Sequence, residues 1–479
     1  MSKKSVSDKK NKNSIIVVLI TLTVLVAGTL LLVNMPDRGS VCKHWYTFFR
    51  TVTEPTAFTC GEKQKTCIKC KDVISQRVNA EVSLPQLYLD GDTQSISKTS
   101  TAVMKACYSD KERQFDVYAT AKYQGHTSLQ FDKKNYTIKF YTDESLEEKY
   151  NVSFNGWDQT SKYCLKANFI DHSGARNIVC ANIWTDIVKS EKNANENISS
   201  LPLRGAVDGF PVALFVNGEY AGLYTMNIPK DEDTYGIADE ENEALVIINS
   251  SLSEAANFHS LLTDGDKDAV FEIEYVYPEK AEWPYEIMDE LIGFVMTSDD
   301  ELFRKGLSGY LDTDTAIDYL IAAYVLGLTD NFSKNMIFLT YDGTKMIPAL
   351  YDMDTAFGLS FDGTYLNEAD FSLPQINEDG TVSSETGNLL WDRVLTCFKD
   401  EFCVRYKELR SDILKNENII SRFEAFISEI PAECYEHDVL LYPDIPFSDI
   451  DHLQQISDFL SVRTEKLDEI VAELTEGDN

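Results

Sequence analysis

Residues 329–358 read TDNFSKNMIFLTYDGTKMIPALYDMDTAFG. Apolar, β-prone runs flank Asp342-Gly343, a dipeptide that is typical of tight hairpin turns. The stretch therefore predicts two antiparallel strands, in which the chain runs out and comes directly back. In this register Asn335 is expected roughly opposite Leu350, so the residues before the first strand and after the second lie close together.

Four polar residues are expected at the open end of this hairpin: Asp330, Asn335, Asp352 and Asp354. Their carboxylate and amide oxygens are the donors that a hard cation such as Mg²⁺ or Mn²⁺ prefers. Asp352 and Asp354 are two positions apart, so on a strand they point to the same face and either one, or both, could reach the metal. The alternative is an ordinary solvated surface, since acidic residues often flank hairpins.

The spacing of Asp330 and Asn335 is also that of a kinase catalytic loop. In such a loop the Asp acts as a base toward the acceptor hydroxyl and the Asn binds Mg²⁺, while a later Asp, here Asp352, holds the metal against the phosphates. Lys334 could contact the transferred phosphate or could simply be a surface charge. The pattern therefore predicts phosphoryl transfer as one function of the hairpin's open end.

Composition limits the partners of the chain. Its 479 residues are enough for one large or two closely packed domains with appendages. The formal net charge of −34 would repel the phosphates of nucleic acid, and no basic aromatic patch compensates for it. Nucleic acid is therefore not an expected partner.

The N-terminal residues predict a membrane anchor. A basic tail over residues 1–13 precedes a nearly unbroken apolar segment over residues 14–35, which is long enough as a helix to cross roughly 30 Å of hydrocarbon. The positive-inside rule then places the N-terminus in the cytoplasm and the main domain outside the cell membrane. A cleavable signal peptide is the alternative, but no small-x-small cleavage site follows the apolar segment.

A Cys-rich module follows the apolar segment. Cys42, His44, Cys67 and Cys70 could form one tetrahedral zinc site, because thiolates and an imidazole at short spacings are favourable zinc ligands. The alternative is disulfide pairing among the four cysteines of the module, which include Cys60. Either solution would stabilise a segment too small to build its own core. The module resembles short Cys/His repeats found on surface proteins of Gram-positive bacteria.

The remaining chain is expected to form one mixed domain. After a spacer over residues 36–77, alternating strand patterns come first and helical periodicity dominates later, within a domain over residues 78–474. Residues 475–479 are a polar tail. This order predicts an α+β architecture with a strand-rich N-terminal part and a helical C-terminal part, preceded by one transmembrane helix.

Four blocks of this domain resemble the spore-coat protein H (CotH) kinase family, an atypical group of kinases. The blocks are residues 123–140, 164–177, 210–224 and 329–358. The resemblance implies an atypical protein-kinase-like fold. It also implies transfer of the γ-phosphate of ATP to Ser or Thr hydroxyls of surface or spore-coat proteins, with Mg²⁺ or Mn²⁺. The alternative is a surface scaffold or adhesin that has the same fold and no catalytic activity.

Carried over residue by residue, the resemblance makes Asp330 the catalytic base and makes Asn335 and Asp352 metal ligands. Lys139, in a strand after a glycine-containing turn, would be the phosphate-contacting lysine. We expect the three oxygen donors to surround a common cleft that Lys139 also faces.

The other blocks carry weaker assignments. Lys166 and Arg176 are implied to reach the nucleotide, and structural ion pairs are the alternative for both. Gln124 and His126 stand where the family has an Arg and often an Asn, and Asn227 stands at a usually acidic position. These departures put detailed roles in the turn and beside Asn227 in doubt.

Overall fold

The computed structural model describes residues 42–125, 127–237, 241–379 and 381–476. The chain divides into two units, Met1–Ser83 and Leu84–Asn479, and each is described here by itself.

The described part of the first unit is a three-stranded antiparallel sheet in the order β1-β2-β3. Its strands are β1 (Arg50–Thr53), β2 (Gly61–Thr66) and β3 (Val73–Val78). Between residues 42 and 79 the only buried apolar side chain is that of Cys67. The sheet therefore forms without a hydrophobic core of its own.

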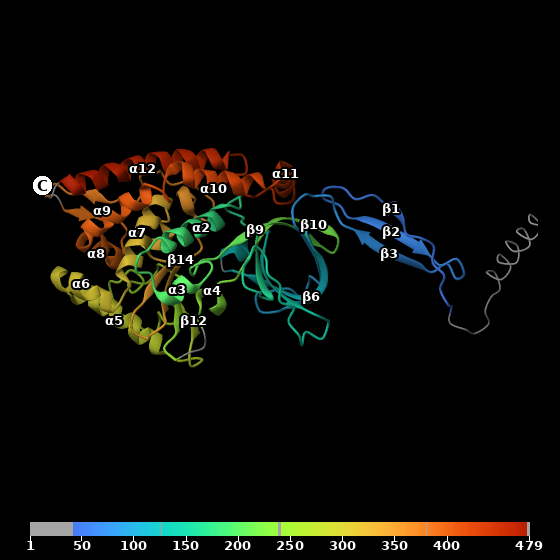
Figure 1. The fold of residues 1–479 in the computed structure, drawn as a ribbon, viewed down its shortest axis with the longest axis horizontal. Helices are drawn as coiled ribbons and strands as arrows, with labels where there is room; N and C mark the ends of the chain where they lie inside the picture. The colour runs from blue at the N-terminus through green and yellow to red at the C-terminus, as the bar shows by residue number, and fades with distance from the viewer. Residues whose placement is uncertain (1–41, 126, 238–240, 380, 477–479) are drawn as a thin grey trace, which may run out of the picture. The chain divides into compact units, whose positions relative to one another are not determined.

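The second unit begins with a closed barrel of seven strands in the order β10-β8-β7-β6-β5-β4-β9 (Figure 1). These strands are β4 (Gln86–Gly91), β5 (Ala102–Ser109), β6 (Gln114–Gln124), β7 (Asn135–Tyr141), β8 (Lys162–Lys166), β9 (Gly209–Val216) and β10 (Glu219–Asn227). The parallel pair β4–β9 and the antiparallel pair β8–β10 close the barrel. Side chains along a strand alternate between the two faces of the barrel wall. On β7, Ile138 and Phe140 are fully buried, while Lys139 between them is exposed.

A four-stranded antiparallel sheet follows, in the order β12-β11-β13-β14. Its strands are β11 (Ala244–Ile248), β12 (Phe271–Val276), β13 (Met336–Thr340) and β14 (Ile347–Leu350). The predicted hairpin around Asp342-Gly343 is confirmed, since β13 pairs antiparallel with β14. Met336 pairs with Leu350, so Leu350 is matched one residue later than we expected.

Helices make up most of the rest of the second unit (Figure 1). They are α2 (Arg176–Lys189), α3 (Glu196–Ser200), α4 (Glu232–Tyr235), α5 (Trp283–Thr297), α6 (Asp300–Gly306), α7 (Thr313–Leu326), α8 (Leu389–Cys397), α9 (Lys399–Arg410), α10 (Asn416–Ser428), α11 (Ala432–Leu441) and α12 (His452–Glu476). The short elements are the 3₁₀ helices η1 (Thr127–Gln130), η2 (Leu307–Gly309), η3 (Asp330–Phe332) and η4 (Ala356–Gly358), with the strand pair β15 (Gln375–Ile376) and β16 (Val382–Ser383).

Helix α7 leads the chain into residues 329–358, the stretch quoted from the sequence. The Asp312 side chain caps its first turn by accepting a hydrogen bond from the Thr315 amide. The helix is buried from Thr315 to Leu326, as its apolar composition on all sides predicts, and it packs on β14. It ends at Gly327, whose left-handed φ of 68° turns the chain toward Asp330.

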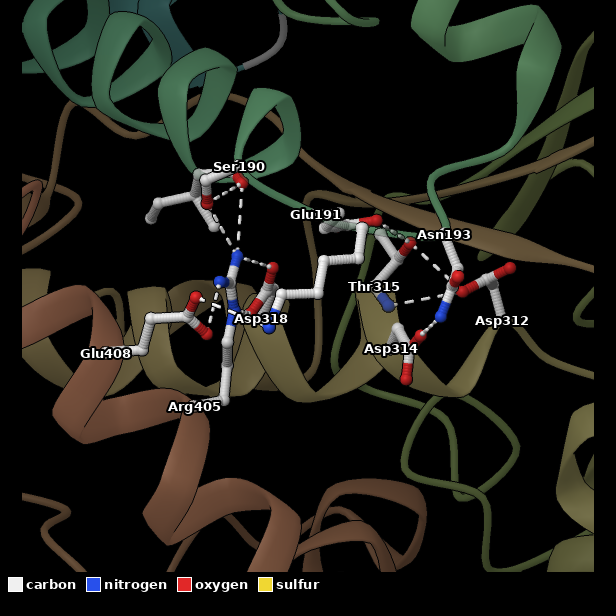
Figure 2. Close-up of polar contacts among 11 residues, drawn as sticks. Ser190, Glu191, Asn193, Asp312, Asp314, Thr315, Asp318, Arg405 and Glu408 are labelled. Carbon is white, nitrogen blue, oxygen red and sulfur yellow. Dashed lines mark hydrogen bonds and ion pairs between the residues drawn. The ribbon is translucent and has the colours of Figure 1, made fainter.

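A polar network joins α2, α7 and α9 (Figure 2). Arg405 on α9 donates hydrogen bonds to both carboxylate oxygens of Asp318 on α7, at 2.7 and 2.8 Å, and to the Ser190 hydroxyl at 2.7 Å. Glu191 lies in the same network. Burial, together with the charges of Asp318 and Asp312, raises the pKa of Glu191 to about 9, so this carboxyl keeps its proton near neutral pH.

The predicted fold class is wrong and needs correction. The protein is a mixed α/β structure with a closed seven-stranded barrel, and among its described residues no helix is long and apolar enough to cross a membrane. Strand periodicity shows where strands occur, but barrel closure depends on pairs distant in sequence, such as Gln86 with Ala213.

The membrane prediction is corrected as well. The basic tail and the proposed anchor, residues 1–13 and 14–35, lie outside the described residues. In the described ranges no helix combines the length and apolar composition needed to cross a membrane. The longest of these helices, α12, packs with one face and carries charged residues on the other. The described residues thus give no support to the predicted single-pass anchor.

Candidate functional site

The site begins where the chain enters β13 and leaves β14. Asp330 lies in η3, Asn335 directly precedes β13, and Asp352 follows β14. Asn335 and Asp352 both have a left-handed φ of 55°. Asn and Asp tolerate this backbone region better than most residues, which suits them to the sharp turns at the ends of these strands. All three side chains are partly exposed and thus accessible to a ligand.

Asn331 holds the two ends of the hairpin together. Its side chain is fully buried, and its amide nitrogen donates hydrogen bonds to the carbonyls of Asn335 at 3.3 Å and Tyr351 at 2.8 Å. The Tyr319 hydroxyl on α7 donates to the Asn331 carbonyl at 2.6 Å. The sequence prediction missed Asn331, although its place beside Asp330 in a loop that must join two strand ends was a usable signal.

Three carboxylates and one lysine of the predicted set interact electrostatically. Burial, then the charge of Asp352, raises the pKa of Asp354 well above its ordinary value, and Asp330 acts in the same direction. Lys166 on β8 opposes that shift. Burial alone would lower the pKa of Lys166, but the charges around it, Asp352 foremost and Asp354 among them, raise it. Asp330, Asp352 and Lys166 therefore lie near enough to Asp354 for their charges to affect its pKa.

Asp354 and Lys166 both keep some solvent exposure, although protein atoms surround their charged groups densely. The carboxylates of Asp352 and Asp354 repel each other, and the single charge of Lys166 compensates only part of theirs. A divalent cation would compensate the remainder.

Lys334 pairs with Asp330 within the same loop. Its ammonium lies 2.7 Å from Asp330 Oδ2, and the two side chains are 26% and 24% exposed. The ammonium also lies over the ring of Phe361, 5.1 Å from the ring centre. Lys334 therefore neutralises the charge of the Asp330 carboxylate.

Lys139 lies elsewhere. It is exposed on β7 and pairs across the sheet with Lys162, whereas Lys166 is at the other end of β8. Burial and the neighbouring charges of Lys162, Lys149 and Lys122 lower the pKa of Lys139. The structure does not group Lys139 with the carboxylates, and the lysine that faces them is Lys166.

Arg176 is fully buried beneath the loop that follows Asp352. It donates hydrogen bonds to Asp171 at 2.5 Å, to the Ala356 carbonyl at 3.0 Å and to Gln455 at 2.6 Å. Gln455 in turn donates to the Phe357 carbonyl at 2.9 Å. The Arg176 guanidinium thus donates its hydrogen bonds to protein groups. This agrees with the alternative that Arg176 forms a structural ion pair. Gln455 was not predicted, because nothing local to it indicates a contact with Phe357.

The positions that depart from the family pattern lie at strand ends. Gln124 ends β6, and His126 is outside the described residues. Asn227 ends β10 and is buried against Gly209, where an added Cβ would come within 2.4 Å of Asn227 Oδ1. The close packing at Gly209 shows that Asn227 has a structural contact at this position.

The Cys/His set of the first unit forms a separate group. One ligand atom each from Cys42, His44, Cys67 and Cys70 lies within 4.8 Å of every other.

Carboxylates, an amide and a lysine around the end of one hairpin are the groups that kinase-like proteins use. A family model described as CotH kinase protein matches residues 121–467, which is most of the chain. The chain therefore belongs to the CotH kinase family, and the resemblance drawn from the four sequence blocks is confirmed. The match does not reach the Cys-rich module, whose resemblance to surface-protein repeats stays a prediction. No curated protein matches the chain.

Proposed function

We propose that the protein transfers the γ-phosphate of ATP to a Ser or Thr hydroxyl of a protein acceptor, with Mg²⁺ or Mn²⁺ as cofactor. The observation that carries the proposal is the electrostatic coupling of Asp354 to Asp330, Asp352 and Lys166, which come from three separate segments of the chain. Membership of the CotH kinase family supports the same chemistry.

The residues fit a divalent cation. Burial, then the charge of Asp352, raises the pKa of Asp354, and a bound cation would favour the ionised carboxylates. Asp352 and Asn335 would hold the metal, with Asp354 as a further ligand. When bound, the cation supplies neutralisation of the phosphate oxygens during transfer.

Asp330 is the proposed base. In the transfer step the acceptor hydroxyl gives its proton to Asp330, its oxygen forms the new bond to the γ-phosphorus, and the bond between that phosphorus and the β,γ-bridging oxygen breaks to release ADP. Lys334, 2.7 Å from Asp330, is placed to contact the transferred phosphate when it exchanges its carboxylate partner. Lys166 is the better candidate than Lys139 for the phosphate-contacting lysine, because it faces the carboxylates.

Label transfer from γ-labelled ATP to the chain itself or to a casein-like acceptor tests the proposal. Wild type should transfer label in the presence of Mg²⁺ or Mn²⁺, and Asp330→Asn should lose transfer while still binding nucleotide. Asp264→Asn is the matched control, because the Asp264 side chain is fully exposed and pairs only loosely with Lys267, at 3.7 Å. Nucleotide binding without any transfer by folded wild type would reject the kinase in favour of a non-catalytic scaffold.

A further inference from the structure

The first unit poses a stability problem that its apolar side chains do not solve. Strands β1 and β3 are almost entirely exposed, and Cys67 is the one buried apolar side chain between residues 42 and 79. A sheet of this size needs a core, a cross-link or a metal in order to stay folded. A compact group of three cysteines and one histidine, close enough to hold one metal ion, lies in this unit.

The cluster joins two separate segments of the unit. Cys42 and His44 precede β1, whereas Cys67 and Cys70 follow β2. A β-bridge between Tyr46 and Cys67 holds these segments side by side. The four ligand atoms within 4.8 Å of one another have the separation expected around one tetrahedral ion with metal–sulfur distances of about 2.3 Å.

The turn at Cys67 is built to stabilise a thiolate. The backbone N–H of Trp45 donates a hydrogen bond to the Cys67 sulfur at 3.4 Å. The Lys71 amide donates to the Cys67 carbonyl at 3.0 Å, and Lys71 has a left-handed φ of 66°. An N–H donor at this sulfur suits a metal-bound thiolate, which carries more negative charge than a disulfide sulfur.

His44 is oriented toward the same point. Its Nδ1 lies 3.4 Å from Cys70 Sγ, and its ring stacks on Tyr46 with centroids 5.2 Å apart. The Tyr46 hydroxyl is anchored by a 2.5 Å hydrogen bond to Asp72, whose carboxylate is also 3.8 Å from His44 Nδ1. A disulfide does not require a nearby imidazole, so the position of His44 favours a metal site over a disulfide.

We propose that Cys42, His44, Cys67 and Cys70 bind one structural Zn²⁺ that replaces the missing core of the first unit. The three thiols lose their protons on binding and His44 binds through a neutral ring nitrogen, so the four ligands and the ion carry a net charge of −1. Cys60 is outside the cluster. The site is independent of the kinase chemistry of the second unit.

Metal analysis of the full chain, purified under reducing conditions, tests this site. Wild type should contain about one zinc per chain, and Co²⁺ in its place should give the visible absorption of a tetrahedral thiolate complex. Cys70→Ser should lower the metal content at least about tenfold, and Cys60→Ser is the matched control that should retain it. His44→Cys keeps four ligands and should bind cobalt with a shifted spectrum, which distinguishes ligation from a general folding defect.

Two results would overturn the proposal. One is a chain without zinc in which non-reducing mass spectrometry finds the module's cysteines joined as disulfides. The other is a zinc content that is unchanged in both Cys70→Ser and His44→Ala, since the metal would then be bound elsewhere.

Discussion

The oxygen donors at the end of the β13–β14 hairpin and the sulfur and nitrogen donors of the Cys/His cluster differ in what holds them in place. Asp330, Asn335 and Asp352 sit on loops that buried groups fix from within, chiefly Asn331 and Arg176. The Cys/His ligands lie in segments that flank the strands of a sheet with almost no buried side chains. The oxygen-donor site should therefore be formed before its metal binds, whereas the Cys/His site should form only when its metal is bound.

Metal removal should produce the largest difference between the two units. Chelation of the full chain should unfold the first unit, because binding energies of roughly 10–16 kcal/mol for structural zinc are folding energy in small metal domains. The second unit keeps its core and should melt as before. Amide hydrogen exchange resolved by peptide checks this, and the comparison fails if residues 61–78 stay protected without metal.

Asp330→Asn comes next in size. Loss of the proposed base should lower kcat by roughly 10²- to 10⁴-fold, the usual range for general base catalysis, while nucleotide affinity changes little. The partly exposed side chain should contribute little to folding, so the melting temperature should stay close to that of wild type. Equal kcat values for Asp330→Asn and the Asp264→Asn control would remove Asp330 from the mechanism.

Asn331→Ala should show that the oxygen site is preorganised. The substitution leaves the carbonyls of Asn335 and Tyr351 without their donor, and unsatisfied buried groups cost about 1–3 kcal/mol of unfolding free energy. Denaturant unfolding measures the loss, and transfer assays should show lower kcat because Asn335 is no longer held. Asn377→Ala is the control, since that exposed amide bonds only within its own turn. Wild-type stability in Asn331→Ala would show that other contacts hold the loop.

The smallest effect concerns pH and the network of Figure 2. The folded-state pKa of Glu191 is raised to about 9 from an ordinary 4.5, so the folded protein binds this proton more tightly than the unfolded chain. The resulting stability is fully present below pH 4.5 and is lost as the pH rises through 9. Glu191→Gln should therefore melt higher than wild type at pH 8 by about 2–4 °C, with no such gain at pH 4.5.

Glu408→Gln is the matched control for this prediction, because Glu408 is 48% exposed in the same network. A wild-type melting temperature that falls no faster with pH than that of Glu191→Gln would show that Glu191 is not held protonated.

Local signals predicted the hairpin correctly. Asp342-Gly343 and the apolar runs beside it depend only on neighbouring residues, and the error of one position in the register arose because the turn extends over several residues around Gly343. The grouping of Asp330 with Asp352 followed from that hairpin.

The rest of the site depends on contacts that sequence patterns do not contain. Lys139 and Lys166 both lie in alternating strands, and only their place in the closed barrel decides which one faces the carboxylates. Gln455 comes from a helix far along the chain and is identified only by its bond to Phe357. Long-range strand pairing and packing therefore determine which of these side chains reach the site, and local periodicity does not contain that information.

Binding of Mn²⁺ together with a non-hydrolysable ATP analogue tests the central claim most directly, with wild type, Asp352→Asn and Cys70→Ser measured side by side. The account predicts that Asp352→Asn weakens Mn²⁺–nucleotide binding at least about tenfold, or 1.4 kcal/mol, while Cys70→Ser leaves it unchanged. Equal binding by wild type and a folded Asp352→Asn protein would contradict the assignment of the hairpin's open end as the metal and nucleotide site.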